Sequence, residues 1–163
     1  MYSQRDPRWG SERLGFSTKN TIGTAGCLLT CFAQLAANYG IETYPGRLNS
    51  KMKAKGLFAG GDLPDNALAR AYPEIASWVG SIDKFRGSAM ELGLFSREPR
   101  EEIIIKVDFN HNPVDGIQGH FVLLREGTVI ADPWYGSVED FSRHYGKPEE
   151  NILRIIKYKF KEV

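Results

Sequence analysis

The stretch TAGCLLTCF, residues 24–32, holds both cysteines of the 163-residue chain at the point where an apolar repeat begins. Apolar residues recur after it at helical spacing, so we expect a core helix over residues 27–39. The apolar positions are Leu28, Phe32, Leu35 and Tyr39. Gly40 is a typical helix end. Residues 1–26 are rich in glycine and polar turns, and we expect them to be irregular.

Cys27 would be the first residue of this helix. The positive end of a helix dipole lowers the pKa of a thiol, and the free N–H at a helix start can stabilise an oxyanion. Gly26 leaves space beside the sulfur. Taken alone, Cys27 is also typical of a small buried apolar residue. Cys31 lies one turn further on, a poor geometry for a disulfide within a helix, so we expect two free thiols with Cys31 in the core.

Helical patterns precede strand patterns along the chain. The expected helices cover 45–55, a segment from a cap at Asp62 to about Tyr72, residues 88–96, and part of 137–146, and the expected strands cover 77–84, 101–109, 120–124, 129–132 and 152–160. A loop is expected over 110–119. This order is typical of an α+β fold with an antiparallel sheet. Because no linker or repeat interrupts the chain, we expect a single domain over residues 1–163.

The hairpin of residues 120–132 predicts a specific pairing. A three-residue loop, 125–127, has glycine in its third position, as a type I turn followed by a left-handed residue requires. This register places Leu124 opposite Thr128 and His120 opposite Asp132, where a carboxylate can orient an imidazole. A two-residue loop would send Asp132 to the other face of the sheet. Without this pairing, His120 is more typical of a structural histidine than of a catalytic one.

The other histidines are weaker candidates for chemistry. His111 lies in the expected loop and competes only weakly with His120 as a base. His144 follows an arginine in a polar segment, so we expect it to be exposed. The acidic residues between 108 and 115 match no calcium-binding loop, and we expect no metal or cofactor.

Composition excludes several classes of protein. The chain is 42% hydrophobic and 25% charged with a net charge of +1, which is typical of a globular protein. It has no sustained basic run, so a nucleic-acid partner is not expected. No apolar stretch reaches the roughly 18 residues of a membrane helix. The polar start, MYSQRDPRWG, is unlike a signal peptide, so we expect a soluble chain, cytoplasmic or exported if a leader was removed. Nothing indicates the oligomeric state.

Four segments together resemble the C39-like cysteine peptidases. They are SQRDPRWG (3–10), LGFS with TIGTAGCLLT (14–17 and 21–30), GHFVLL (119–124) and IADPWYG (130–136). The order of these motifs matches the family, and the likeness extends from Ser3 to about Gly136. The resemblance implies a papain-like fold, in which a central helix carrying the nucleophile packs on a C-terminal antiparallel sheet.

The resemblance also implies roles for individual residues. Gln4 would be the oxyanion-hole side chain, Cys27 the nucleophile, His120 the general base and acid, and Asp132 the orienting carboxylate, with Trp134 packed nearby. The order Gln, Cys, His, Asp is that of papain-like enzymes. We further expect Asp6 and Trp9 to anchor the segment that carries Gln4.

Three functions are compatible with these residues. The first is a thiol peptidase acting on peptide amides, as in free-standing bacterial and phage relatives. The second is a peptidoglycan-cleaving endopeptidase or amidase on the same fold, although the Asp-Cys-Ser signature of one such group is absent around Cys27. The third is a binding module without activity, which the intact set of four residues disfavours. Family members that process bacteriocins after a double glycine are fused to a transporter, which this chain lacks, so their substrate does not carry over.

Overall fold

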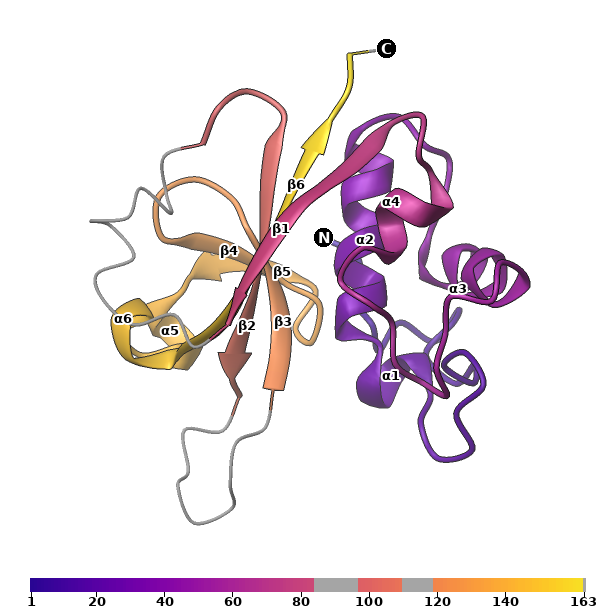
Figure 1. Ribbon diagram of the computed structural model, residues 1–163. Helices are drawn as coiled ribbons and strands as arrows, with labels where there is room; N and C mark the ends of the chain where they lie inside the picture. Colours follow the sequence, from indigo (N-terminus) through magenta and orange to yellow (C-terminus); the bar gives the residue numbers. More distant parts are fainter. Residues whose placement is uncertain (84–96, 110–118, 163) are drawn as a thin grey trace.

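The computed structural model describes residues 1–83, 97–109 and 119–162. The N-terminal part forms helices α1 to α4, which gather beside one face of a sheet built by residues 76–160 (Figure 1). These helices are α1 (Ile22–Ala25), α2 (Cys27–Asn38), α3 (Pro45–Ala54) and α4 (Ala67–Ala71). The coarse prediction of an α+β fold with an antiparallel sheet is therefore confirmed.

The sheet has six antiparallel strands in the order β1-β6-β2-β3-β4-β5. The strands are β1 (Ala76–Asp83), β2 (Glu101–Asp108), β3 (Gly119–Leu124), β4 (Val129–Asp132), β5 (Ser137–Asp140) and β6 (Ile152–Phe160). Two short helices, α5 (Ser142–Tyr145) and α6 (Pro148–Asn151), connect β5 to β6. The last strand lies between β1 and β2, so the sheet is complete only when the end of the chain is in place.

Both faces of the sheet are covered by apolar side chains. Successive residues of a strand point to opposite faces, so the side chains of Ile103–Ile105 pack on both faces of the sheet. Ile104 packs in the cluster that joins the sheet to the helices, whereas Ile103 and Ile105 pack with Tyr145 of α5 on the other face. This double burial explains why β2 contains three consecutive isoleucines, Ile103–Ile105.

Helix α2 is the centre of the first layer. Cys31, Phe32 and Leu35 are fully buried in it. The Phe32 ring meets Tyr158 of β6 edge-on, with centroids 5.7 Å apart. The helix begins at Cys27 because α1 ends directly before it, where the Gly26 N–H donates to the Ile22 carbonyl over 2.8 Å.

Several boundaries differ from the sequence prediction. Helix α1 lies inside the region expected to be irregular, and a reciprocal capping box between Thr21 and Thr24 starts it. Asp62 caps no helix, because its backbone pairs with Ala59 in a turn and α4 begins only at Ala67. The segment 137–146, expected to contain one helix, first extends the sheet as β5 and then forms α5. The predicted helix 88–96 and residues 110–118 of the predicted loop lie outside the described residues.

The hairpin between β3 and β4 has a longer loop than predicted. Leu124 pairs with Ile130 and Leu123 with Ala131, and the Arg125 N–H donates to the Val129 carbonyl over 2.8 Å. The predicted pairing was therefore wrong by two positions. Because side chains alternate with a period of two, a shift of two leaves each residue on its predicted face. His120 and Asp132 accordingly lie diagonally, on the same face.

Candidate active site

The start of α2 and the start of β3 meet at a pocket of about 260 Å³. Its lining includes three of the four predicted site residues, Gln4, Cys27 and His120. Asp132 lies behind His120, completely buried. The structure thus brings together residues from the N-terminus, α2, β3 and β4 that the sequence assigned to one site.

Cys27 and His120 are electrostatically coupled. Burial alone raises the pKa of the Cys27 thiol, but a hydrogen bond with His120 and the charge of its ring outweigh burial, so the pKa falls below its ordinary value. Burial lowers the pKa of His120, whereas its contacts with Asp132 and Cys27 raise it more strongly, to about 9. These opposite shifts favour the pair of thiolate and imidazolium over the neutral thiol and imidazole.

The imidazole has a fixed orientation. Its Nε2 lies 2.8 Å from Oδ1 of Asp132, which leaves Nδ1 as the ring nitrogen available to Cys27. Only 5% of His120 is exposed. Burial raises the pKa of Asp132, but hydrogen bonds from His120 and Tyr145 outweigh it, so the pKa is lowered and the carboxylate stays ionised.

Tyr145 is a site residue that the sequence did not indicate. Its hydroxyl donates to Oδ2 of Asp132, while Oδ1 accepts both His120 and the Trp134 N–H, the latter over 2.9 Å. Burial and the adjacent carboxylate raise the pKa of Tyr145 far above its ordinary range, which keeps the hydroxyl a donor. A tyrosine in a four-residue helix, 13 positions after Asp132, leaves no recognisable pattern in the sequence.

Gln4 is held rigidly at the pocket. Its backbone N–H donates to the Pro133 carbonyl over 2.8 Å, and its side-chain Nε2 donates to the Gly23 carbonyl over 3.1 Å. The side-chain amide nitrogen carries two hydrogens, so one donor remains beyond the bond to Gly23. This second donor and the N–H of Cys27, which has no acceptor within the helix, are two candidates for holding an oxyanion.

The N-terminal segment is anchored beside Gln4. Trp9 is almost completely buried, and its indole N–H donates to the Ser3 carbonyl over 2.9 Å, as expected from the sequence. Arg5 was not predicted to contribute, yet its Nε donates to the Trp134 carbonyl over 2.9 Å and its guanidinium lies 4.4 Å from the Trp134 ring centroid. The Asp6 carboxylate instead binds Arg8, so Asp6 shapes the local turn.

Aromatic side chains cover the buried pair of His120 and Asp132. The Phe109 ring meets His120 edge-on with centroids 5.0 Å apart, and it meets Trp134 at 5.5 Å. Trp134 was expected near the site, but Phe109 at the end of β2 was not. The rings limit the access of water to the bond between His120 and Asp132, which strengthens that bond.

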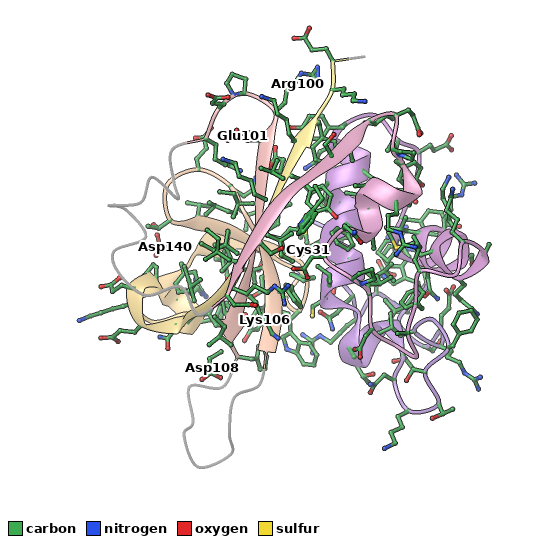
Figure 2. The ribbon with its side chains drawn as sticks, in the orientation of Figure 1. Cys31, Arg100, Glu101, Lys106, Asp108 and Asp140 are labelled. Atoms are coloured by element: carbon green, nitrogen blue, oxygen red, sulfur yellow. The ribbon has the colours of Figure 1, made fainter. Side chains whose placement is uncertain are left out.

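The remaining cysteine and histidines have other environments. Cys31 is fully buried with its Sγ 3.7 Å from the Phe121 carbonyl, and burial raises the pKa of its thiol well above the ordinary value (Figure 2). His144 is not exposed as predicted, because its ring stacks on Tyr135 at 4.1 Å and its Nε2 lies 2.6 Å from Glu139. His111 lies outside the described residues.

Two features are absent from the described part of the chain, a metal site and a membrane-spanning helix. Among residues 1–83, 97–109 and 119–162, no group of three or more His, Cys, Asp and Glu side chains is arranged to hold a metal ion. Within the same ranges, no helix is long and apolar enough to cross a membrane. Comparisons of the chain with protein-family models, curated proteins and solved structures found no significant match.

Proposed function

We propose that this chain is a cysteine peptidase that hydrolyses peptide amide bonds, on a papain-like scaffold similar to that of the C39-like peptidases. The observation that carries the proposal is the coupled series Cys27, His120 and Asp132 at one pocket, with the pKa of the thiol lowered and that of the imidazole raised. A structural cysteine buried in a core has the opposite shift, as Cys31 does.

Acylation begins with the thiolate of Cys27. Its sulfur attacks the carbonyl carbon of the substrate, and the carbonyl electrons move onto the oxygen. The Cys27 N–H and the free side-chain donor of Gln4 stabilise this oxyanion. The imidazolium of His120 then gives its proton to the departing nitrogen, the C–N bond breaks, and a thioester to Cys27 remains.

Hydrolysis of the thioester regenerates the enzyme. Neutral His120 takes a proton from a water molecule, whose oxygen attacks the thioester carbonyl through the same oxyanion site. The C–S bond breaks, and Cys27 leaves as a thiolate beside the imidazolium. Asp132 keeps the ring oriented and stabilises its positive charge in both steps.

A cleavage screen tests the proposal. The protein is incubated with a peptide library and, separately, with peptidoglycan fragments, and products are identified by mass spectrometry. We expect cleavage of peptides that disappears in Cys27→Ala. The matched control is Cys31→Ala, which removes the other thiol of the same helix and should keep activity within a few-fold.

The alternatives predict different outcomes. Cleavage of peptidoglycan fragments without cleavage of unstructured peptides would indicate a cell-wall endopeptidase. A binding module without activity predicts that Cys27 reacts with iodoacetamide at pH 6 no faster than an ordinary thiol. That result would overturn both enzyme functions.

A further inference from the structure

A second pocket, of about 230 Å³, meets the candidate active site at Cys27. The wall opposite the sheet is largely apolar and includes Ala25, Leu28 and Leu29 from α1 and α2, with Leu14 and Leu63 from loops. Its sheet wall carries two cations, Lys106 of β2 and Arg154 of β6. Of the four proposed catalytic residues, only Cys27 lines both pockets.

The two cations differ in their partners. Arg154 forms ion pairs with Asp65 and with Asp83, the latter at 3.4 Å, so its charge is compensated. Within the described part of the chain, the Lys106 ammonium has no carboxylate within 4.0 Å and lies 5.7 Å from the Phe121 ring centroid. Lys106 is half-buried. It is therefore the cation of this pocket that can accept a carboxylate from outside.

Two features of the sheet direct Lys106 toward the helices. In β2, Lys106 pairs with Phe121, whose side chain packs in the cluster between sheet and helices, and paired residues share a face. Gly119 gives Lys106 room beside His120, because a Cβ at position 119 would lie 2.3 Å from Cε and 3.2 Å from Nζ of Lys106. The ammonium consequently lies beside the end of β3 that carries the proposed base.

The proposed chemistry assigns the two pockets to different parts of a substrate. His120 protonates the departing nitrogen, so the leaving part lies in the pocket that His120 and Trp134 line. The acyl part, bound to Cys27 after the first step, then extends into the pocket that holds Lys106.

We infer that the second pocket binds an acidic side chain on the acyl side of the scissile bond, and that Lys106 is the residue that selects it. This inference rests on the proposed peptidase function. Two carboxylates also line the pocket, those of Asp62 and Asp65. Asp65 is paired with Arg154, and Asp62 is exposed at the turn 59–62, where water and salt screen its charge. The half-buried ammonium therefore dominates the preference.

Peptidyl chloromethyl ketones test this selection without requiring turnover. Each places an acyl chain against Cys27, whose sulfur displaces chloride, and three versions carry Glu, Gln or Lys as the side chain nearest the reactive group or one residue before it. Glu and Gln have nearly the same shape, so their ratio of inactivation rates isolates charge. We expect Glu to react roughly tenfold faster than Gln in the native chain, the size of one half-buried ion pair.

Substitutions at position 106 test whether Lys106 causes the preference for Glu. Lys106→Gln should abolish the preference for Glu, and Lys106→Glu should reverse it in favour of Lys. The matched control, Lys55→Gln, removes an exposed lysine beyond α3 and should leave all three rates unchanged. Near-equal rates for Glu and Gln in the native chain, or a Glu preference that survives both substitutions, would overturn the inference while leaving the peptidase proposal intact. Failure of all three compounds to modify Cys27 would instead count against the peptidase proposal and, with it, this inference.

Discussion

The hydroxyl of Tyr145 donates a hydrogen bond to the carboxylate oxygen of Asp132 that His120 does not use. Both oxygens of this fully buried carboxylate are therefore satisfied by protein groups. A buried carboxylate without such donors would take up a proton and lose its effect on the imidazole. Tyr145 thus acts through Asp132, as a positioning residue.

Replacing Tyr145 with Phe removes this donor and keeps the ring. Hydrogen bonds to charged groups contribute about 1.5–3 kcal/mol, and we expect a loss of that order in the free energy of unfolding. Because the carboxylate is stabilised less, the pKa of Asp132 should rise. The acidic limb of the pH profile for Cys27 alkylation by iodoacetamide should therefore move to higher pH.

Tyr158→Phe is the control for this prediction. Tyr158 is also fully buried, and its hydroxyl donates to the Asp65 carbonyl. The Tyr158→Phe substitution should also reduce the free energy of unfolding, but it should leave the pH profile of Cys27 alkylation unchanged. An unshifted acidic limb in Tyr145→Phe would show that Tyr145 only stabilises the fold.

The raised pKa of His120 predicts a loss of activity in alkali. The folded protein binds this proton more tightly than the unfolded chain, because the pKa is about 9 against an ordinary 6.5. The resulting contribution to the free energy of unfolding is fully present below about pH 6.5 and is lost as the pH rises through about 9. Peptide hydrolysis, which needs the imidazolium, should decline through the same upper limit.

The rate of peptide hydrolysis and the free energy of unfolding in urea, both measured at a series of pH values, check this prediction. In His120→Gln, the dependence of unfolding free energy on pH between about 6.5 and 9 should become weaker than in the native chain. Hydrolysis that keeps rising well above pH 9 would contradict the assignment of His120 as the acid.

Gln4→Ala should separate hydrolysis from thiol reactivity. Removal of one oxyanion donor typically lowers kcat by about 100-fold or more. Alkylation by iodoacetamide forms no tetrahedral oxyanion, so its rate at Cys27 should stay within a few-fold of native. Equal losses in both rates would mean that Gln4 supports the structure of the pocket rather than the oxyanion.

Gly26→Ala tests the junction that places Cys27. A Cβ at this position would lie 2.5 Å from the Ile22 carbonyl oxygen, so the backbone between α1 and α2 has to move. We expect a loss of about 1–3 kcal/mol in the free energy of unfolding and slower alkylation of Cys27. Thermal unfolding and alkylation rates measure both effects. Gly80→Ala in β1 is the control, because among the described residues no atom beyond its two chain neighbours lies within 4 Å of the added Cβ, and it should show neither effect.

Long periodic segments were predictable from the sequence because local patterns determine them. Helix α2 begins at Cys27 as predicted, and β6 has its predicted bounds, residues 152–160. Shorter elements depend on tertiary pairing: β5 forms because β4 offers it an edge, although the segment around Phe141 contains a helical pattern. The hairpin illustrates both cases, since its existence was predictable but its loop length was not.

The residues of the candidate site likewise include some that the sequence indicated and some that it did not. The resemblance of the four motifs proposed Cys27, His120, Asp132 and Gln4, and the structure places three of them at one pocket with Asp132 buried behind His120. Tyr145, Phe109 and Arg5 escaped prediction because their contributions are contacts between distant segments, 129 positions apart for Arg5 and Trp134. Such contacts follow from the folded backbone and leave no spacing pattern.

The attachment of Gln4 and Arg5 to residues 133 and 134 has a consequence during synthesis. On the proposed mechanism, the sulfur at the head of α2 lacks both its base and a held donor for the substrate oxygen while the ribosome is still making the second half. The nascent chain would then be unable to cleave peptides, and activity would arise only when the strands close and the N-terminal segment docks on them.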